Sequence, residues 1–543
     1  MAKTSKKKHF AKNVKEKNSS GIFDFINSLL VDPRFPYILS EFYFVVMLIV
    51  SLNYHTIGDY GVETDFYEGM VYEAKEFLKG NLIIEGYKGP LYPVFLALLG
   101  FIFKDYFALG VIICVVSASV FLFFTYKTVE KIYTPQIAFG VVLLMMSNSV
   151  FIQYSYSAGT DLFFCALAMI SIYFLVKGKE LKLSYLFLAG LFASLAFLTR
   201  TNGLFLPAAA LFCFVGIKYT SRHWKKIFQH SLIYIGGFLL LNIPWSIYKY
   251  IHKGDFFYDR NFTNIAWELF GQGKMSWDYF QAVESPKFNS MADVFLRDPF
   301  HFLKEIFVIN FYENFVGDLE KLLSIPFAVV LVIGIIALFK RKYVKNQVFF
   351  LINILFAFLI LLPAFYSERF SLFLISGYAL IVLLLLNLDQ LDKIKVGGLK
   401  LSLLIFSVVF CWSLVEGITH NSKQIDFGPQ EVLAISQAAP DSIKTEANWV
   451  IARKPHIGYY LNMSYRKIPY VSTYDSLLTW MKQKKADYFF VSSFEAQTLM
   501  SYTTNQNEQQ KFYNLLNWQA EKQDLIPVTY MSYPPAVLYK LVR

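Results

Sequence analysis

The sequence is poor in charge and in cysteine for its length. Charged residues make up 17% of its 543 positions, whereas hydrophobic residues make up 55% and aromatic residues 18%. Ordinary soluble domains are about 25% charged, so this composition argues against that class. The four cysteines lie in apolar runs without metal-ligand spacing, and we expect them to pack as small hydrophobic side chains. They are Cys114, Cys165, Cys213 and Cys411.

Several motifs of soluble catalytic sites are absent as well. The chain contains no Asp-x-Asp pair, which removes support for a metal-held nucleotide-sugar site, and no Gly-x-x-x-x-Gly-Lys phosphate loop. The eight histidines show no ligand spacing, so we predict neither a metal nor another cofactor. The net charge of +11 does not indicate nucleic-acid binding, because much of it lies in the lysine-rich segment 3–17.

Long apolar runs recur between residues 36 and 419, and each is about long enough to cross the hydrocarbon core of a bilayer. We therefore predict an all-α polytopic membrane protein with about eleven transmembrane helices. Residues 90–103 are apolar but short for a span, which favours a membrane-surface or re-entrant helix. The expected spans are 36–54, 106–126, 136–153, 160–176, 184–199, 203–218, 228–246, 321–339, 347–365, 371–388 and 401–419.

Lysines and arginines gather in alternate short loops between these spans. One set of loops is positive, whereas the other short loops carry few positive charges. Since positive loops stay in the cytoplasm, the bias places the basic N-terminal segment (1–35) inside. Eleven spans then place the tail (420–543) outside. Representative residues of the positive loops are Lys127, Lys177, Lys225, Arg341 and Lys393.

Three segments are expected at the outer face of the transmembrane part (36–419). The first, at about 55–105, contains an apolar helical face that is typical of a helix lying on the membrane surface. This face consists of Tyr67, Val71, Ala74 and Leu78. The second is an aromatic-rich loop at about 247–320, and the third is the tail.

The tail changes character and is mostly polar. Its short apolar runs at 449–452 and 488–491 are typical of strands, and helical stretches are expected near 473–485 and 494–516. This alternation predicts a small extracytoplasmic α/β domain.

Ionisable residues near a bilayer are costly to bury and therefore suggest function. Asp65, just after the first span, is the best candidate for a general base, because sugar transfer needs a group that takes the acceptor's proton. The alternative is a solvated acid that caps the helix expected after it. Lys88, before Gly89, can bind a phosphate as a point charge or extend its ammonium to the interface.

Three further groups lie at expected outer turns. Asp161 begins a span, where the helix dipole favours an acid. Arg200 and Asn202 lie in the turn between the fifth and sixth spans, where an arginine can bind phosphate bidentately. Glu368 and Arg369 lie between two apolar runs and can also pair with each other.

In their order along the chain, these motifs resemble those of the GT-C glycosyltransferases, above all the bacterial relatives of protein O-mannosyltransferases and lipid A aminoarabinose transferases. The chain departs from that branch in two places. It has Asp65-Phe66 where the branch often has Asp-Glu, and Gly89-Pro90-Leu91 where it often has Pro-Pro-Leu. The matching features are Asp65, the run Lys88 to Tyr92, Asp161, Leu198 to Gly203, Ile243-Pro244-Trp245, Gly254 to Phe257, Glu368-Arg369-Phe370, Ala452 to His456, and Ala486-Asp487-Tyr488.

The resemblance implies a glycosyltransferase of a bacterial inner membrane, a hexosyl or pentosyl transferase that uses a polyprenyl-phosphate sugar as donor and works with inversion. The acceptor would be a glycan, a lipid or a protein at the extracytoplasmic face. Asp65 would then be the catalytic base, and Lys88, Arg200 and Arg369 would bind the donor phosphate. The expected substrate-binding residues are Glu63, Tyr92, Asp161, Asn202 and Glu368.

Two other functions share some of these features. A polytopic lipid or solute transporter also has many spans and a few outer charges, but the chain shows no inverted repeat and no paired broken helices. A GT-C-like polysaccharide polymerase or ligase would share the donor chemistry. The order of the motifs favours the branch named above over this polymerase or ligase.

Overall fold

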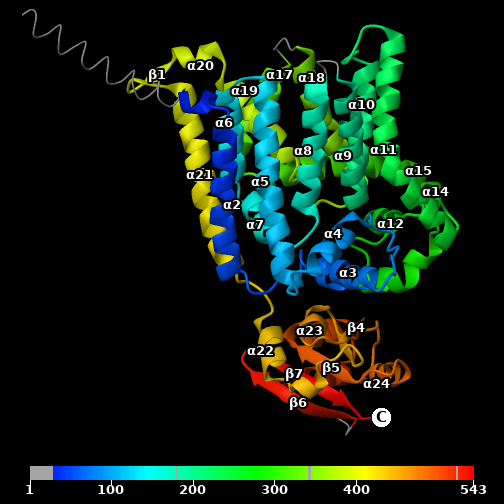
Figure 1. The fold of residues 1–543 in the computed structure, drawn as a ribbon. Coiled ribbons are helices and arrows are strands. Elements are labelled where there is room, and N and C mark those ends of the chain that lie inside the picture. The colour runs from blue at the N-terminus through cyan, green and yellow to red at the C-terminus, as the bar shows by residue number, and fades with distance from the viewer. Residues whose placement is uncertain (1–27, 179–181, 340–343, 521–523, 543) are drawn as a thin grey trace, which may run out of the picture.

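The computed structural model describes residues 28–178, 182–339, 344–520 and 524–542 (Figure 1). A helical bundle is followed by a smaller domain, whose first helix begins at Gln430. The basic N-terminal residues up to 27 lie outside the described part of the chain.

Each apolar run predicted to span the membrane contains at least one helix in the structure. Among the described residues, four helices are long and apolar enough to cross a membrane: α2 (Phe35–Tyr54), α5 (Tyr106–Ile132), α11 (Trp224–Lys253) and α21 (Leu401–Gln424). The pair α6 (Pro135–Ser147) and α7 (Ser149–Tyr156), bent by 68°, is a fifth if it forms one span. The rest of the bundle comprises α8 (Asp161–Gly178), α9 (Leu183–Thr199), η2 (Thr201–Leu204), α10 (Phe205–Val215), α17 (Ile325–Leu338), α18 (Lys345–Leu359) and α19 (Leu374–Leu386).

Local sequence explains the bend between α6 and α7. The Asn148 side chain accepts a hydrogen bond from the Phe151 amide at 2.9 Å, and so caps α7 while α6 ends. Its amide nitrogen also donates to the Leu322 carbonyl at 2.7 Å, which fixes the break inside the protein. Helices α9 and α11 pack closely, since a Cβ on Gly190 would lie 1.9 Å from the Tyr234 carbonyl oxygen.

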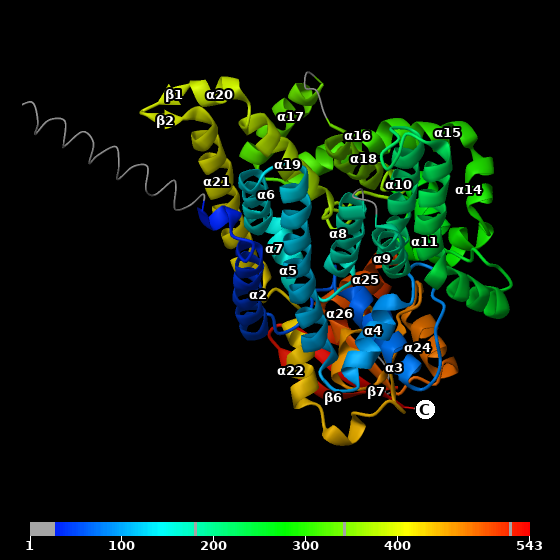
Figure 2. The same ribbon diagram turned by 45° about the horizontal axis from the view of Figure 1, so that its top comes forward.

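The two ends of the bundle differ. One end, which we call the domain end, carries the C-terminal domain together with η1 (Phe66–Met70), α3 (Val71–Leu78) and α4 (Leu91–Gly100) (Figures 1 and 2). The opposite end carries α20 (Asp389–Lys393) and the hairpin of β1 (Lys395–Val396) and β2 (Leu399–Lys400). The predicted outer segment and the tail therefore share one end, and a lysine-bearing loop lies at the other.

Two features of the first outer segment bear on its predicted place at the membrane. The ten residues of α4 rise about 15 Å, half of a hydrocarbon core, so this helix alone is too short to span one. The apolar face of α3 does not lie on the membrane as predicted, because protein covers it. Tyr67, Val71 and Ala74 are buried in the main core, and only Leu78 is exposed. Tyr67 is enclosed by aromatic rings of the bundle and of the tail, among them Phe107 and Tyr459.

The segment predicted as a long loop at 247–320 is largely helical. Helix α11 continues to Lys253, and Gly254 ends it in a left-handed conformation that favours glycine. Short helices follow: α12 (Phe262–Phe270), α13 (Trp277–Tyr279), η3 (Phe280–Glu284), η4 (Ser285–Lys287), α14 (Met291–Arg297), α15 (Pro299–Lys304), η5 (Glu305–Ile309), α16 (Asn310–Gly317) and η6 (Asp318–Leu322).

The tail forms a five-stranded sheet in the order β4-β3-β5-β7-β6, in which β3 is parallel to β4 and β5, and β7 is antiparallel to β5 and β6. Both strands predicted from the sequence are confirmed, as β3 (Trp449–Ala452) and β5 (Tyr488–Ser492). The other elements are α22 (Gln430–Ala438), η7 (Asp441–Ile443), α23 (His456–Tyr460), β4 (Ser464–Lys467), α24 (Tyr474–Gln483), α25 (Ser493–Ser501), α26 (Gln506–Asn514), η8 (Leu515–Asn517), β6 (Leu525–Ser532) and β7 (Pro535–Leu541).

Alternate residues of the strands fill two separate cores. Ile451 and Phe489 belong to the core that includes residues of α24 and α25, whereas Val450 and Phe490 face α22 and α23. Ile57, from the loop after α2, lies in the second core and so joins the tail to the bundle.

Candidate active site

Asp65 lies at the domain end, where three segments far apart in the sequence meet. The Lys88 ammonium lies 2.9 Å from Asp65 Oδ2, and the Arg369 guanidinium lies 3.3 Å from the same oxygen. Lys88 precedes the turn into α4, and Arg369 lies in the turn between α18 and α19. The Asp65 side chain keeps 39% of its surface exposed, so the carboxylate is paired but accessible.

The structure excludes the alternative that Asp65 only caps a helix. Its side chain makes no capping hydrogen bond at the start of η1. The next residue, Phe66, is fully buried, and a Cβ on Gly110 would meet its ring at 2.6 Å. Phe66, where the GT-C branch often has an acid, is therefore a core residue that anchors the turn presenting Asp65.

The turn that carries Lys88 depends on a glycine. A Cβ on Gly89 would lie 2.0 Å from the Leu198 carbonyl oxygen. Any other side chain would push the turn away from the end of α9. This close approach explains why glycine stands here, and it brings Lys88 toward the turn that holds Arg200.

Arg200 is not a free cation, because it forms a buried ion pair with Asp161. Both side chains are at most 10% exposed, and Arg200 also donates to the Thr160 hydroxyl at 3.4 Å. The Phe370 ring centroid lies 5.0 Å from the guanidinium carbons of both Arg200 and Arg369. The two ion pairs are therefore neighbours that share one aromatic ring.

These charges set the proton affinity of Asp65. Burial alone would raise the pKa of the Asp65 carboxyl, but the charges of Lys88 and Arg369 outweigh it and hold that pKa well below its usual range. Burial would lower the pKa of Arg369, but Asp161 and Asp65 raise it. With its cations in place, Asp65 is ionised at neutral pH but binds a proton weakly.

Two carboxylates that the sequence analysis missed lie beside this cluster. Glu73 and Glu85 line a small cavity together with Asp65 and Lys88. Burial, aided by the charge of Glu85, raises the pKa of Glu73 to about 7, and burial also raises the pKa of Glu85. The spacing of Glu73 two helical turns after Asp65 could have identified it. In the described part of the chain, no group of three or more His, Cys, Asp or Glu side chains could hold a metal ion.

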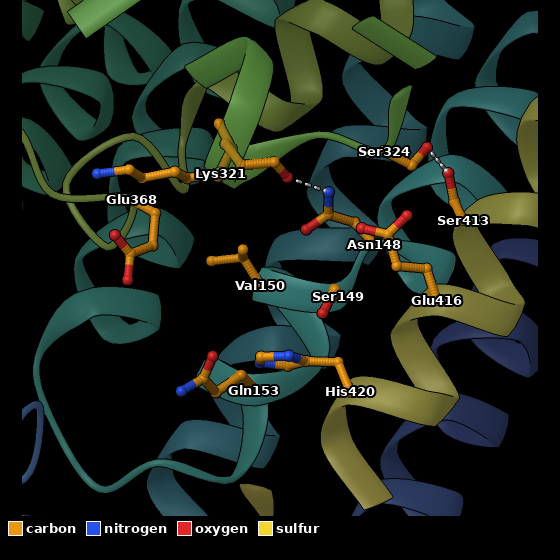
Figure 3. A pocket seen from close by; sticks show the side chains of 11 residues that line it. Asn148, Ser149, Val150, Gln153, Lys321, Ser324, Glu368, Ser413, Glu416 and His420 are labelled. Carbon is orange, nitrogen blue, oxygen red and sulfur yellow. Dashed lines mark hydrogen bonds between the residues drawn. The ribbon is translucent and has the colours of Figure 1, made fainter. Parts of the chain in front are cut away.

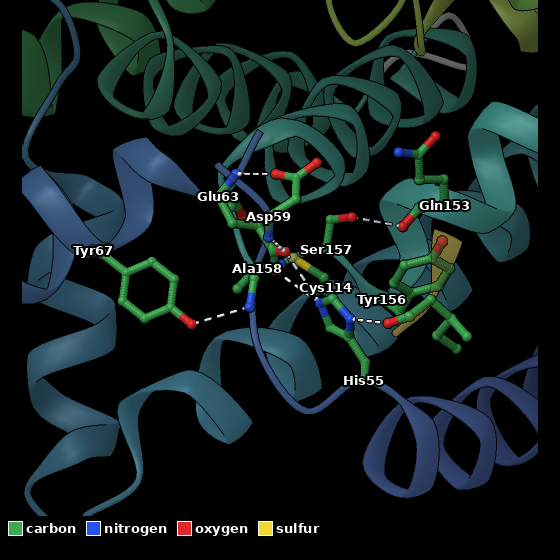
Figure 4. Close-up of polar contacts among 12 residues, drawn as sticks. His55, Asp59, Glu63, Tyr67, Cys114, Gln153, Tyr156, Ser157 and Ala158 are labelled. Atoms are coloured by element: carbon green, nitrogen blue, oxygen red, sulfur yellow. Dashed lines mark hydrogen bonds and ion pairs between the residues drawn. The ribbon is translucent and has the colours of Figure 1, made fainter. Parts of the chain in front are cut away.

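Glu63, predicted to bind substrate, is buried and binds the protein instead (Figure 4). His55 Nε2 lies 3.1 Å from both of its carboxylate oxygens, and the Ala158 and Asp59 amides donate to the carboxylate at 2.6 and 3.2 Å. Burial would lower the pKa of His55, but the Glu63 charge reverses this and raises it. Since Ala158 precedes Asp161 by three residues, Glu63 positions the segment that pairs with Arg200.

The remaining predicted substrate-binding residues lie in different surroundings. Tyr92 is fully buried on α4, and its hydroxyl has no hydrogen-bond partner among the described residues. Asn202 is half-buried in η2, next to the Arg200 turn. Glu368 does not pair with Arg369. It lines a separate, larger cavity between α7 and α21 (Figure 3).

Comparisons with known proteins identify similar chains. Residues 87–248 match the family model of dolichyl-phosphate-mannose-protein mannosyltransferase. A comparison with curated proteins finds no match. The structure is similar to that of ArnT from Cupriavidus metallidurans bound to undecaprenyl phosphate, with a TM-score of 0.58 and 11% identity over 94% of this chain and 98% of that one. It is also similar to archaeal oligosaccharyltransferase AglB from Archaeoglobus fulgidus in complex with an inhibitory peptide and a dolichol-phosphate, with a TM-score of 0.51 and 11% identity over 86% of this chain and 70% of that one.

Proposed function

We propose that this integral membrane protein, which has the fold of the GT-C glycosyltransferases, transfers a sugar from a polyprenyl-phosphate donor to an acceptor at the domain end. The observation that carries the proposal is the convergence of Asp65, Lys88 and Arg369 on one accessible point. The phosphate-linked lipids named for ArnT and AglB support the donor class.

In this reaction, the donor phosphate binds the cations of the cluster. Lys88 and Arg369 are one-fifth exposed and can reach a phosphate at the surface of the site. Arg200, which is paired with Asp161, adds to the positive electrostatic potential at the phosphate without binding it directly. The bond between the anomeric carbon and the phosphate oxygen breaks, and the phosphate gains negative charge as it leaves. Preorganised cations stabilise that charge, which is the main catalytic contribution of the cluster.

Asp65 takes the proton of the acceptor hydroxyl or amine while that atom bonds to the anomeric carbon, and a single displacement inverts the configuration there. The donor phosphate also competes with Asp65 for Lys88 and Arg369. When the phosphate takes part of their charge, the pKa of Asp65 rises toward its usual value, so the base strengthens once the donor is bound. The donor is therefore expected to bind before the acceptor.

In this function the protein lies in a bacterial inner membrane, with the domain end at the extracytoplasmic face. No metal or other cofactor takes part, and the acceptor is a glycan, a lipid or a protein. The tail domain contacts α3 through Lys75 and Glu446, 3.2 Å apart, and contacts the 247–320 segment through Asp278, so we expect an acceptor to approach between these contacts. Asp278 marks this contact, because Lys467 and Arg453 of the tail lie 2.7 and 3.1 Å from it.

Transfer of label from a panel of polyprenyl-phosphate sugars to host envelope acceptors tests the proposal. The purified protein is assayed in lipid as wild type, Asp65→Asn and Glu76→Gln, the last being a control carboxylate on α3 that pairs with Lys79. We expect the wild type and the control to transfer one sugar, and Asp65→Asn to lose at least about 100-fold in rate. Equal transfer by Asp65→Asn would show that Asp65 is not the general base. Movement of the lipid across vesicles by the wild type, with no transfer, would identify a transporter.

A further inference from the structure

A second polar cavity lies between α7, α21 and the turn that holds Glu368 (Figure 3). Its volume of about 320 Å³ falls at the lower end of the range of ligand pockets, which is about 300–1,000 Å³. Glu368 faces this cavity, while the next residue, Arg369, pairs with Asp65. Because Glu368 and Arg369 are consecutive residues of this turn, the cavity lies beside the catalytic cluster.

The polar side chains of this cavity fall into two sets. Asn148 makes hydrogen bonds to the backbone, and the hydroxyls of Ser324 and Ser413 hydrogen-bond to each other at 2.6 Å. The other set makes no side-chain hydrogen bond or ion pair to another described residue. It consists of Gln153, Lys321, Glu368, Glu416 and His420. These side chains are half-buried or exposed, and Lys321 also lies 5.5 Å from the Tyr366 ring centroid. They are therefore free to exchange water for a polar ligand, as polar groups in a ligand pocket do.

Two members of this second set lie on a helix that is long and apolar enough to cross a membrane. They are Glu416 and His420, which are four residues apart on α21. Both are exposed on the bundle. An ionisable side chain on such a helix is costly in lipid and is retained where it lines a path or a binding site.

The mixture of groups identifies the ligand class. Two carboxylates and an amide oxygen accept hydrogen bonds, whereas an ammonium and an amide NH₂ donate them, and the imidazole can do either. A phosphate would meet two carboxylates here, which repel it. A saccharide, whose hydroxyls both donate and accept, satisfies all of these groups.

We propose that this cavity binds a saccharide unit of the substrate, beside the Asp65 cluster. The inference rests on the proposed glycosyl transfer and deepens it by naming a second subsite. The saccharide is either the sugar of the donor or a glycan of the acceptor, since both present the same hydroxyl chemistry.

Saturation-transfer NMR on the full-length protein in nanodiscs tests the site, with a panel of free methyl glycosides and glycan fragments as probes. We compare the wild type with Glu416→Gln and His420→Leu. The control is Asp441→Asn, which removes a carboxylate that is 96% exposed in the tail, outside the cavity. We expect one saccharide to bind the wild type and the control, and each cavity variant to bind it about tenfold more weakly. Unfolding temperatures identify any variant that fails to fold. In that case the other cavity variant alone is used to test saccharide binding.

Polyprenyl phosphate without a sugar is the reference probe, and we expect all of these proteins to bind it equally. In the transfer assay, a raised KM for the donor alone assigns the cavity to the donor sugar, and a raised KM for the acceptor alone assigns it to the acceptor glycan. Saccharide binding that survives both substitutions, or its absence from the wild type across the panel, overturns the proposal. Loss of transfer in Asp65→Asn with unchanged saccharide binding separates this site from the catalytic cluster.

Discussion

Replacing Lys88 by glutamine should weaken donor binding without unfolding the protein. The ammonium lies 2.9 Å from Asp65 Oδ2 and is 21% exposed, so its interactions are partly screened by solvent. A hydrogen bond to a charged group contributes about 1.5–3 kcal/mol, and the exposure of this site favours the lower half of that range. At about 1.4 kcal/mol for each factor of ten, the KM for a polyprenyl-phosphate sugar should rise about tenfold to fortyfold.

The same substitution should also change the pH dependence of transfer. In the wild type, Lys88 and Arg369 keep the pKa of Asp65 well below its usual range, so loss of activity through its protonation occurs only in strong acid. Without Lys88 that pKa rises, and the acid limb of kcat/KM moves to higher pH. Lys79→Gln is the matched control, because Lys79 is an exposed lysine on the same outer segment. A donor KM within twofold of the wild type, with an unmoved acid limb, would refute the electrostatic reasoning.

Three further predictions follow from buried contacts. Asp161→Asn leaves the guanidinium of Arg200 buried without its counter-charge and should destabilise the fold by about 3–5 kcal/mol, seen as a lowered unfolding temperature; an unchanged temperature would contradict the pairing. The pKa of His55 is raised, so its pairing with Glu63 stabilises the fold at low pH, and this contribution is lost as pH rises through the folded-state pKa. Glu63→Gln should flatten that part of the curve of unfolding temperature between pH 5 and 9, and a curve of the same shape would argue against the pair. Gly89→Ala should reduce the transfer rate at least tenfold by displacing the Lys88 turn. Gly236→Ala, where a Cβ meets open space, is the control and should leave the rate unchanged. Equal rates for the two variants would show that the turn can accommodate a Cβ without displacing Lys88.

Much of the fold could be predicted from the sequence because its strongest signals are local. Long apolar runs predicted the bundle helices, and the short runs at 449–452 and 488–491 predicted strands of the tail. The segment after Lys253 was expected to be a loop, because its helices are too short to show a periodic pattern. The apolar face of α3 indicated burial correctly, but the sequence could not show that protein rather than lipid covers it.

The site was only partly predictable, because its geometry is tertiary. Asp65 and Arg369 were both identified from their positions next to apolar runs, yet 304 residues separate them, and no local pattern shows that they meet. Glu368 and Arg369 were expected to be able to pair, but neighbours in a turn point in different directions. Glu63 stood out as an acid near Asp65, and only the structure shows its carboxylate enclosed by His55 and backbone amides.

Helix α21 joins two parts of the molecule mechanically. It supplies one wall of the polar cavity through Glu416, and it is also the single covalent connection between the bundle and the tail domain. Its last turn is fastened to α7, since Asn421 bonds the Tyr156 hydroxyl at 2.8 Å and the Ser149 carbonyl at 3.0 Å. The tail can therefore reach the cavity only by moving α21 against this fastening, since residues 425–429 between α21 and α22 form no helix and can bend without it.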